Sequence, residues 1–229
     1  MIAIIPARGG SKRILNKNKK LFNGIPIIIQ VINILKSINE ISRIVISTDD
    51  PEIITLVSNE GLEVPFKRPL SLSDDLTGTL PVIKHAISEL NLKEDQIVAC
   101  VYPTNIFINQ EIVLKAQNST ISNSNAMTFT VKKYDHPIQR AFTLNYKNEV
   151  VLDLDSKLGS RTQDLKDYFH DAGQIYAART ATWQGLDQII TSGSVALDIS
   201  DHLHVDIDYP EDWAKAEQIY KLIEKKDYR

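Results

Sequence analysis

The chain has 229 residues, and its 26 Lys and Arg against 29 Asp and Glu give a formal net charge of −3. Hydrophobic residues make up 43% and charged residues 24%, a globular composition that excludes a disordered chain. The slightly acidic balance argues against nucleic acid as a partner, because a phosphate backbone selects basic surfaces. A chain of this length buries a sizeable core without a disulfide or a structural metal, and we expect one domain over residues 1–229.

Three features favour a cytoplasmic protein with no membrane segment. Residues Met1–Pro6 lack the basic start of a signal peptide. The most apolar stretch, Ile25–Leu35, is too short to span a bilayer. The single cysteine, Cys100, lies in an apolar run and has no partner for a disulfide, so we expect a buried, inert thiol in a reducing compartment.

Strand and helix patterns alternate along the first half. Short apolar runs are typical of strands buried on both faces, and prolines open the helices that follow them. Such alternation predicts a parallel sheet whose ligand site forms where loops leave the carboxyl ends of the strands. The predicted elements are strands at Ile2–Ile5, Arg43–Ser47, Glu63–Phe66 and Ile97–Tyr102, and helices beginning at Pro26 and Pro51 and over Pro81–Leu90.

The pattern changes after a predicted strand at Ala126–Val131. The Ser- and Asn-rich stretch Gln117–Asn125 reads as a loop. Residues of about 133–170 show no helical periodicity and carry a hairpin signal at Lys147-Asn148, so we expect an insertion with its own strands that serves as an oligomer arm. After it come a parallel strand over Gly173–Ala178, a short strand over Val205–Asp208 and an amphipathic helix from Pro210.

A cationic, glycine-containing loop leaves the first predicted strand directly. Gly9 and Gly10 allow close backbone approach to a ligand, and Ser11 adds a hydroxyl donor. This combination suits a polyphosphate, although neither G-x-x-x-x-G-K-[ST] nor G-x-G-x-x-G is present. A basic, solvated loop is the alternative, and the position after the first strand favours the phosphate. The cations of the loop are Arg8, Lys12, Arg13 and Lys17.

Asp206 and Asp208 are spaced so that both carboxylates face the same side of a strand. Together with nucleotide phosphates they suit Mg²⁺, which binds oxygen ligands and rarely occupies an all-protein cage. The alternative is that Asp208 caps the helix from Pro210. Asp50, which precedes Pro51, has the same ambiguity, and there we favour the cap.

Polar side chains are dense between residues 161 and 174. Arg161, Gln163, His170 and Gln174 can together recognise a polar, anionic substrate. For His170 alone, an ordinary loop histidine is the alternative interpretation.

The segment Ile5-Pro6-Ala7-Arg8-Gly9-Gly10-Ser11-Lys12-Arg13, followed by Lys17-Asn18, resembles the opening signature of the CMP-sialic acid synthetases, cytidylyltransferases that activate 2-keto acid sugars. The resemblance continues in order through Ser47-Thr48-Asp49, Arg68-Pro69, Ser73-Asp74-Asp75 and Asp206-Ile207-Asp208. The subfamily that it resembles most is that of the pseudaminic acid cytidylyltransferases, through residues 137–140, 161–165 and 170–176.

This resemblance implies an α/β, Rossmann-like nucleotidyltransferase fold, with a mostly parallel sheet flanked by helices and a small β-containing insertion that forms a homodimer. The implied reaction joins CTP and an acidic nine-carbon sugar into a CMP-sugar and pyrophosphate, with Mg²⁺ or Mn²⁺ as cofactor. Two positions depart from the family pattern. Leu15 stands where proline is usual, and residues 103–108 lack the Pro-Leu-Arg ending common in N-acetylneuraminate enzymes, which argues against that sugar.

The resemblance also implies residue roles. Catalytic roles fall to Arg8, Lys17, Asp206 and Asp208, and the two aspartates hold the metal. CTP is expected to contact Arg8, Gly9, Gly10, Ser11, Lys12, Asn18 and Arg68. The sugar is expected to contact Gln139, Arg140, Arg161, Gln163, His170 and Gln174, some of them across the dimer.

Three alternatives stay open. The same chemistry could act on legionaminic, N-acetylneuraminic or 3-deoxy-octulosonic acid. A glycosyltransferase would also use an Asp-x-Asp pair, but it does not explain the loop from Arg8 to Arg13. A non-catalytic regulator would bind CTP without turnover.

Overall fold

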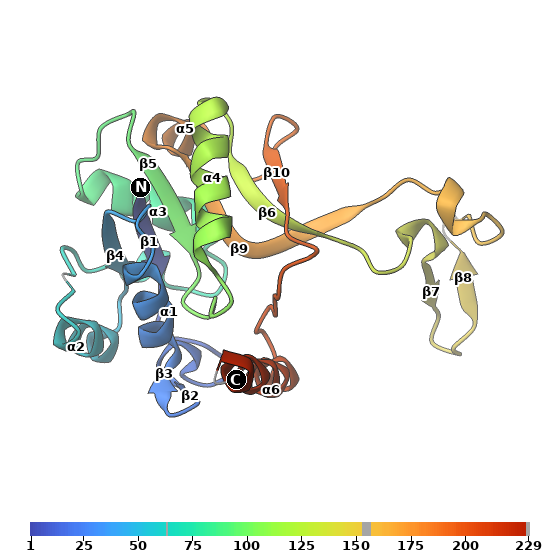
Figure 1. Ribbon diagram of the computed structural model, residues 1–229, viewed down its shortest axis with the longest axis horizontal. Coiled ribbons are helices and arrows are strands. Elements are labelled where there is room, and N and C mark those ends of the chain that lie inside the picture. Colours follow the sequence, from blue (N-terminus) through green and yellow to red (C-terminus); the bar gives the residue numbers. More distant parts are fainter. Residues whose placement is uncertain (63, 153–156, 228–229) are drawn as a thin grey trace.

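A central six-stranded sheet forms the framework of the fold (Figure 1). The computed structural model describes residues 1–62, 64–152 and 157–227. The strand order is β10-β6-β9-β5-β1-β4, and every strand runs in the same direction except β9. The predicted, mostly parallel α/β sheet is therefore confirmed. Its strands are β1 (Ile2–Pro6), β4 (Arg43–Ser47), β5 (Ile97–Val101), β6 (Thr128–Lys133), β9 (Phe169–Arg179) and β10 (Val195–Asp198).

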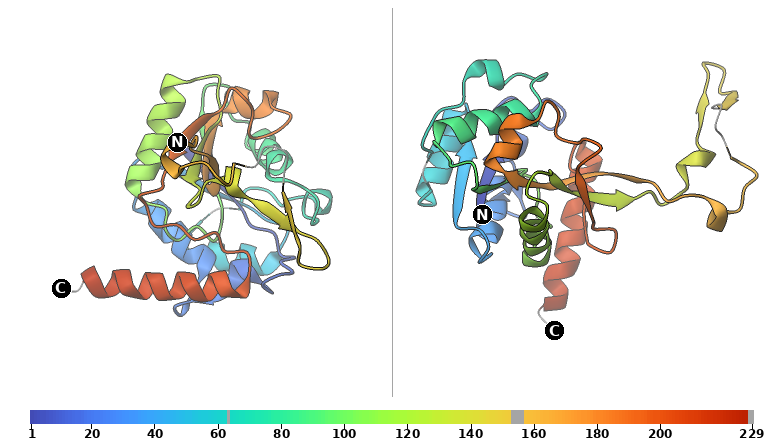
Figure 2. Two further views of the ribbon diagram at one scale, coloured as in Figure 1. Left: turned by 90° about the vertical axis from the view of Figure 1, so that its right-hand side faces the viewer. Right: turned by 90° about the horizontal axis from the view of Figure 1, so that it is seen from above.

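Helices cover both faces of the sheet, as the continuous apolar runs of the strands predict (Figure 2). In β1, Ala3 and Ile5 face one buried cluster, and Ile2 and Ile4 face the other, because successive side chains of a strand alternate. The first cluster takes residues from α1 (Ile27–Lys36), α2 (Pro51–Asn59), α4 (Gln110–Ser122) and α6 (Pro210–Asp227). The second takes residues from α3 (Thr79–Glu89) and α5 (Thr180–Gly185).

Proline and a capping aspartate fix where the early helices begin. Helix α1 starts directly after Pro26, and α2 starts at Pro51. The Asp50 carboxylate accepts a hydrogen bond from the Glu52 backbone N–H at 2.8 Å, so the predicted cap is confirmed. Cys100 is buried in β5, where burial raises the pKa of its thiol, as expected of an inert core cysteine.

Two predicted strands are wrong in direction or place. The segment Gly173–Ala178 belongs to β9, but β9 is antiparallel to both β5 and β6. Residues Val205–Asp208 form no strand, and the last strand of the sheet is β10, a short edge strand with half-exposed side chains. Hydrophobic pattern cannot reveal strand direction, and an edge strand lacks the apolar run of a central one.

Two further predictions need correction. The stretch Gln117–Asn125 is largely helical, because α4 continues to Ser122. The Thr120 hydroxyl donates hydrogen bonds to the carbonyls of Ala116 and Ala177, so this polar side chain is accommodated inside the helix. Of the strand predicted at Glu63–Phe66, residue 63 lies outside the described residues, and residues 64–66 form no strand.

The C-terminal helix is anchored on a small N-terminal hairpin, β2 (Leu21–Phe22) and β3 (Ile25–Pro26). The Phe22 ring meets Trp213 and Tyr220 edge-on, with ring centroids 5.5 Å apart in each pair. The Lys20 ammonium lies 4.5 Å from the centre of the Trp213 ring. This packing holds the segment before α6 beside the loop that follows β1.

An arm projects from the body between β6 and β9 (Figures 1 and 2). It carries the antiparallel hairpin of β7 (Phe142–Leu144) and β8 (Val150–Leu152), and Asn148 adopts a positive φ of 62° in its turn. The hairpin predicted at Lys147-Asn148 is therefore present. Within the described part of the chain, no helix is both long and apolar enough to cross a membrane. The remaining short elements are 3₁₀ helices at Lys17–Lys19, Leu70–Leu72, Ile138–Arg140 and Thr162–Asp164.

The two loop glycines make a matched test of backbone packing. A Cβ on Gly9 would lie 2.9 Å from an Asp50 carboxylate oxygen, whereas a Cβ on Gly10 would meet nothing within 4 Å. We expect Gly9→Ala to lower the free energy of unfolding by about 1–3 kcal/mol, because it overpacks the Asp50 cap. Gly10→Ala should change it by less than about 0.5 kcal/mol. Urea denaturation checks both, and equal stabilities for the two variants would contradict the close approach.

Candidate active site

A cavity of about 430 Å³ opens at the carboxyl ends of β1 and β5, the edge predicted to carry the ligand site. Its walls come from four parts of the chain: the loop after β1, the loop before α3, the junction of β5 with β9, and the segment before α6. The polar residues lining it are Arg8, Ser11, Lys12, Arg13, Lys17, Asn18, Arg68, Asp74, Thr77, Thr79, Tyr102, Thr104, Asp171, Tyr176, Asp206 and Asp208.

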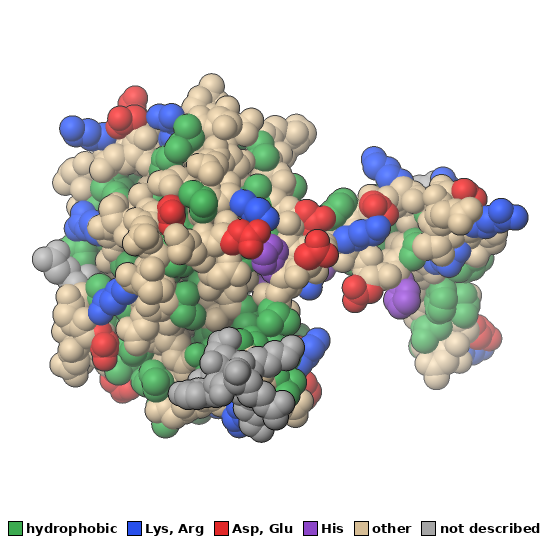
Figure 3. All heavy atoms as spheres, in the orientation of Figure 1, with side chains coloured by type: hydrophobic (Ala, Val, Ile, Leu, Met, Phe, Trp, Pro, Cys, Tyr) green, Lys and Arg blue, Asp and Glu red, His purple; other side chains and the backbone are tan. Residues whose placement is uncertain are grey.

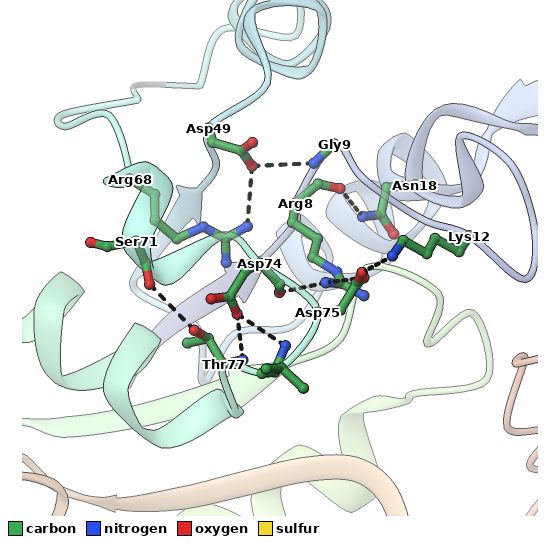
Figure 4. A network of polar contacts seen from close by, with 11 residues as sticks. Arg8, Gly9, Lys12, Asn18, Asp49, Arg68, Ser71, Asp74, Asp75 and Thr77 are labelled. Carbon is green, nitrogen blue, oxygen red and sulfur yellow. Dashed lines mark hydrogen bonds and ion pairs between the residues drawn. The ribbon is translucent and has the colours of Figure 1, made fainter.

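The loop after β1 is held in place from both sides (Figure 4). One Asp49 carboxylate oxygen accepts a hydrogen bond from the Gly9 N–H at 3.2 Å and lies 3.4 Å from an Arg68 guanidinium nitrogen. On the other side, the Asn18 side-chain amide donates to the Arg8 carbonyl at 2.9 Å. Asp49 and Asn18 therefore fix the loop backbone, so that its side chains can be directed into the cavity.

Arg68 brings a buried cation to the cavity wall, with only 3% of the residue exposed. Burial lowers the pKa of Arg68, while the Asp49 carboxylate opposes this shift, and a guanidinium of this basicity stays charged. Its Nε is buried and finds no hydrogen-bond acceptor among the described residues. A buried guanidinium with an unpaired N–H at a cavity wall favours a ligand that accepts hydrogen bonds there, such as a phosphate or a carbonyl oxygen.

Asp75 pairs with two cations of the cavity wall, Arg8 and Lys12. Its carboxylate lies 2.9 Å from an Arg8 guanidinium nitrogen and forms a second ion pair with Lys12 (Figure 4). The Lys12 hydrogen bond and the Arg8 charge together lower the pKa of Asp75. The neighbouring Asp74 carboxylate accepts from the N–H groups of Leu76 and Thr77 and so shapes the turn. Asp75 thus supplies the negative charge that a bound phosphate would bring.

The carboxylate of Asp208 faces the cations rather than the helix. It lies 2.9 Å from Arg13 and 3.3 Å from Lys17. The backbone N–H groups of Asp208 and Tyr209 donate hydrogen bonds to the Asp212 carboxylate, at 3.1 and 2.8 Å. No helix N–H donates to the Asp208 carboxylate among the described residues, which argues against the capping alternative for Asp208. The Asp212 carboxylate instead ties the first turn of α6 to the segment before it.

Asp206 opens onto the same cavity without an ion-pair partner among the described residues. Partial desolvation by the surrounding protein raises the pKa of the Asp206 carboxyl, and the negative charge of Asp208 adds to this effect. The part of the chain that the structure describes holds no cluster of three or more His, Cys, Asp or Glu side chains suited to a metal. A pair of carboxylates is what Mg²⁺ uses when phosphates complete its coordination, so the residues present fit that ion.

The wall formed by β5 and β9 is polar but carries no cation. The Tyr176 hydroxyl donates to one Asp171 carboxylate oxygen at 2.6 Å, and the Gly173 N–H donates to the other at 2.8 Å. Next to them, the hydroxyls of Tyr102 and Thr79 lie 2.7 Å apart. This wall therefore offers hydroxyl and carboxylate groups opposite the cationic loop.

The structure brings one part of the predicted site together and leaves another part outside it. Gly9 and Gly10 shape the loop but do not line the cavity, and the Gly9 N–H is already bound by Asp49. The predicted residues that line it are Arg8, Ser11, Lys12, Lys17, Asn18, Arg68, Asp206 and Asp208.

None of the six predicted sugar contacts lines the cavity of its own chain. Gln174 is fully buried in β9, and the His170 ring packs on Tyr134. Gln139 and Arg140 bond to backbone carbonyls within the arm, which also carries Arg161 and Gln163 (Figure 1). For the residues of the arm, contact with the sugar remains a prediction that requires the arm to reach a second copy of the chain. The burial of Gln174 argues against direct contact of its side chain with the sugar.

The sequence alone does not predict the positions of Asp75 and Asp171 at this site. Asp75 belongs to the family segment Ser73-Asp74-Asp75, and a lone aspartate gives no further signal. Asp171 lies in the polar segment before Gln174, in which His170 is the predicted contact. The Gly173 backbone, with a φ of +62°, turns Asp171 toward the cavity, and this bulge is visible only in three dimensions.

The ion pairs of Asp75 predict a measurable change in anion affinity. Asp75→Asn frees Arg8 and Lys12, so the affinity for inorganic pyrophosphate should rise about twofold to fivefold, as expected for losing partly exposed ion pairs. Asp95→Asn, the same charge change on an exposed loop before β5, is the control. Titration calorimetry at low and high salt checks this, and unchanged affinity in Asp75→Asn would show that Asp75 does not compete with anions.

Comparison with known proteins identifies the family of the chain. A family profile described as "Cytidylyltransferase" matches residues 2–222. A pseudaminic acid cytidylyltransferase of Campylobacter jejuni subsp. jejuni serotype O:2 is 36% identical over 224 residues, covering 96% of each chain. A CMP-N,N'-diacetyllegionaminic acid synthase of the same organism is 39% identical over 87 residues, 38% of this chain and 37% of that one. The solved structure of a CMP:2-keto-3-deoxy-manno-octonic acid synthetase complexed with CTP shares the fold, with a TM-score of 0.71 at 16% identity over 96% of this chain and 98% of that one. The chain belongs to the cytidylyltransferase family.

Proposed function

We propose that this cytidylyltransferase joins CTP to pseudaminic acid and releases pyrophosphate. The observation that carries the proposal is the division of one cavity into a cationic wall, a carboxylate pair and a wall without cations. The cationic wall suits a triphosphate, the carboxylate pair suits its metal ion, and the wall without cations suits an uncharged part of a sugar. The relative that spans 96% of both chains is named for this sugar, which favours it over other acid sugars.

The cationic wall is suited to the triphosphate. Arg8, Lys12 and Lys17 supply charge, and Ser11 supplies a hydroxyl donor. These groups neutralise the charge that develops on the phosphoryl oxygens as pyrophosphate leaves, so positioning and electrostatics provide the acceleration. Arg68 and Asn18 line the cavity where it meets the anchored backbone of the loop after β1, and we place the nucleoside there.

Asp206 and Asp208 would hold Mg²⁺ at the other side of the phosphates. When bound, this ion neutralises charge on the phosphate oxygens and orients them. In the chain itself, the Lys17 ammonium donates to the Ile207 carbonyl at 2.6 Å and pairs with Asp208, which fixes the distance between the carboxylates and the loop.

The reaction that fits this arrangement is an in-line displacement. The anomeric hydroxyl of the sugar attacks the α-phosphorus of CTP and loses its proton to a base. An O–P bond forms, and the bond to pyrophosphate breaks. Lys17 lies between the carboxylate pair and the phosphate loop, so it can remain bonded to the phosphates during transfer. The sugar then occupies the space beside Tyr102, Thr104 and Tyr176.

We further propose that the arm forms a homodimer. Phe142 pairs with Leu152 and Leu144 with Val150, so these four side chains share one face of the hairpin and are 49–57% exposed. Figure 3 shows apolar side chains gathered on this arm. An isolated two-stranded hairpin is at best marginally stable, so a second copy of the chain is the cover that we infer.

We also propose a cytoplasmic location. The single cysteine, Cys100, is buried and needs no oxidising compartment, and the proposed substrate CTP is a nucleotide of the cytoplasm.

The function is tested by pyrophosphate release with CTP and Mg²⁺. Pseudaminic, legionaminic, N-acetylneuraminic and 3-deoxy-octulosonic acids are supplied separately, and the CMP-sugar is identified by its mass. We expect release with pseudaminic acid at a rate far above the others. Release with another sugar alone would overturn the choice of sugar, and CTP binding without release from any of the four would indicate a regulator.

Lys17 and Asp208 should each be essential for turnover. We expect Lys17→Ala and Asp208→Ala to lower kcat at least about a hundredfold, because each removes charge stabilisation at the phosphates. Lys36→Ala, which removes an exposed lysine whose ammonium donates to the Glu60 carbonyl far from the cavity lining, is the control. Steady-state kinetics measures kcat for each variant, and thermal melting verifies that each variant is folded. Wild-type rates in either site variant would mean that the site is misplaced.

The two faces of the arm hairpin provide a matched test of the dimer. Leu144→Asp places a charge on the apolar face and should convert the protein to a monomer. Thr143→Asp places the same charge on the opposite face and should leave the dimer intact. Light scattering after size exclusion measures the molar mass. A mass of one chain for the unmodified protein would overturn the dimer.

A further inference from the structure

Asp171 is a rigidly oriented carboxylate in the cavity wall. Its two oxygens accept from the Gly173 N–H at 2.8 Å and from the Tyr176 hydroxyl at 2.6 Å. The Tyr176 ring is itself held between Tyr102, edge-on at 5.8 Å, and Phe129, stacked at 6.5 Å. Both donors of Asp171 therefore belong to packed parts of the sheet, so the carboxylate has a fixed direction.

Asp171 is one of four carboxylates that line the cavity. Asp208 pairs with Arg13 and Lys17, and Asp206 beside it is the proposed metal ligand. The Asp74 carboxylate is bound by the turn N–H groups of Leu76 and Thr77. Among the described residues, no lysine, arginine or histidine forms an ion pair with Asp171, although it is exposed and lines the cavity. Each carboxylate oxygen can accept more than one hydrogen bond, so Asp171 retains acceptor capacity toward the cavity.

The position of Asp171 excludes a phosphate or the sugar's own carboxylate as its partner. Both are anions and are attracted to the cations on the opposite wall, and Asp171 would repel them. Of the groups that the sugar carries, the one that meets Asp171 must therefore be a hydrogen-bond donor. A hydroxyl can turn to donate or accept, whereas the N–H of an acylamino group can only donate, so a fixed carboxylate discriminates most strongly for such an N–H.

We infer that Asp171 determines specificity for the sugar by accepting a hydrogen bond from an acylamino N–H of the substrate. This inference rests on the proposed function and extends it to the class of substrate: acid sugars with an acylamino substituent directed at β9. A stereoisomer that presents its carbonyl oxygen there instead would face the lone pairs of Asp171 without a donor. The same contact therefore favours one stereoisomer and opposes the other.

The test is the kinetics of Asp171→Asn, which keeps the shape and one acceptor oxygen but removes the charge. Pseudaminic acid, its stereoisomer legionaminic acid, and 3-deoxy-octulosonic acid, which has hydroxyls but no amide N–H, are the probes. We expect the KM for pseudaminic acid to rise about tenfold or more, because hydrogen bonds to charged groups are the stronger ones, while the KM for CTP changes less than about twofold. The preference for pseudaminic acid over the other two should shrink by a similar factor.

Two further variants separate recognition from folding. Asp95→Asn, at the far end of β5, should change neither KM. Asp171→Glu keeps the charge but displaces it by one methylene, and we expect a smaller loss for pseudaminic acid with CTP binding retained. Thermal melting and CTP titration show which variants are folded.

The outcomes are distinct. A sugar KM within twofold of wild type in Asp171→Asn, with the preference retained, would overturn the role of Asp171 while leaving the function intact. A parallel rise in the KM for CTP would reduce Asp171 to a support for the Gly173 turn. An unmodified enzyme that releases pyrophosphate with none of the sugars would overturn the proposed function, and this inference with it.

Discussion

The bond between Lys17 and the segment before α6 is the contact on which the site depends. The Lys17 ammonium reaches the Ile207 carbonyl at 2.6 Å and the Asp208 carboxylate at 3.3 Å, and so joins residues 190 and 191 positions apart in the chain. Packing of Phe22 on Trp213 supports the same junction a short distance away. Without this closure the Asp206–Asp208 pair would lie on an unanchored, irregular segment, and its distance from the cationic loop would not be fixed.

Charge balance explains how so many cations can be held together. A cluster of lysines and arginines repels itself unless nearby carboxylates compensate it, and here Asp49, Asp75 and Asp208 each pair with one or two of them. These ion pairs are largely at the cavity surface, where each contributes little free energy and can exchange for a ligand phosphate. The site is therefore preorganised in charge and remains open to an anion.

The reversed strand β9 gives the sheet its second functional surface. Because β9 runs against β5, its amino-terminal end lies beside the carboxyl end of β5, and Asp171 and Tyr176 join Tyr102 at the cavity. The same strand continues outward into the arm (Figure 1). One antiparallel strand thus links the wall proposed for the sugar to the surface proposed for the dimer.

The sequence by itself determined the alternating α/β elements, the edge of the sheet that carries the cavity, and most of its charged residues from Arg8 to Asp208, because buried runs, prolines and charged loops are local signals. It also placed the arm hairpin at Lys147-Asn148. The tertiary structure alone decided the direction of β9, the edge strand β10, the pairing of Asp75 with the loop cations and the orientation of Asp171. These features depend on contacts between segments distant in the chain, and a local pattern of hydrophobic and polar residues carries no information about which distant segment will lie alongside, or in which direction.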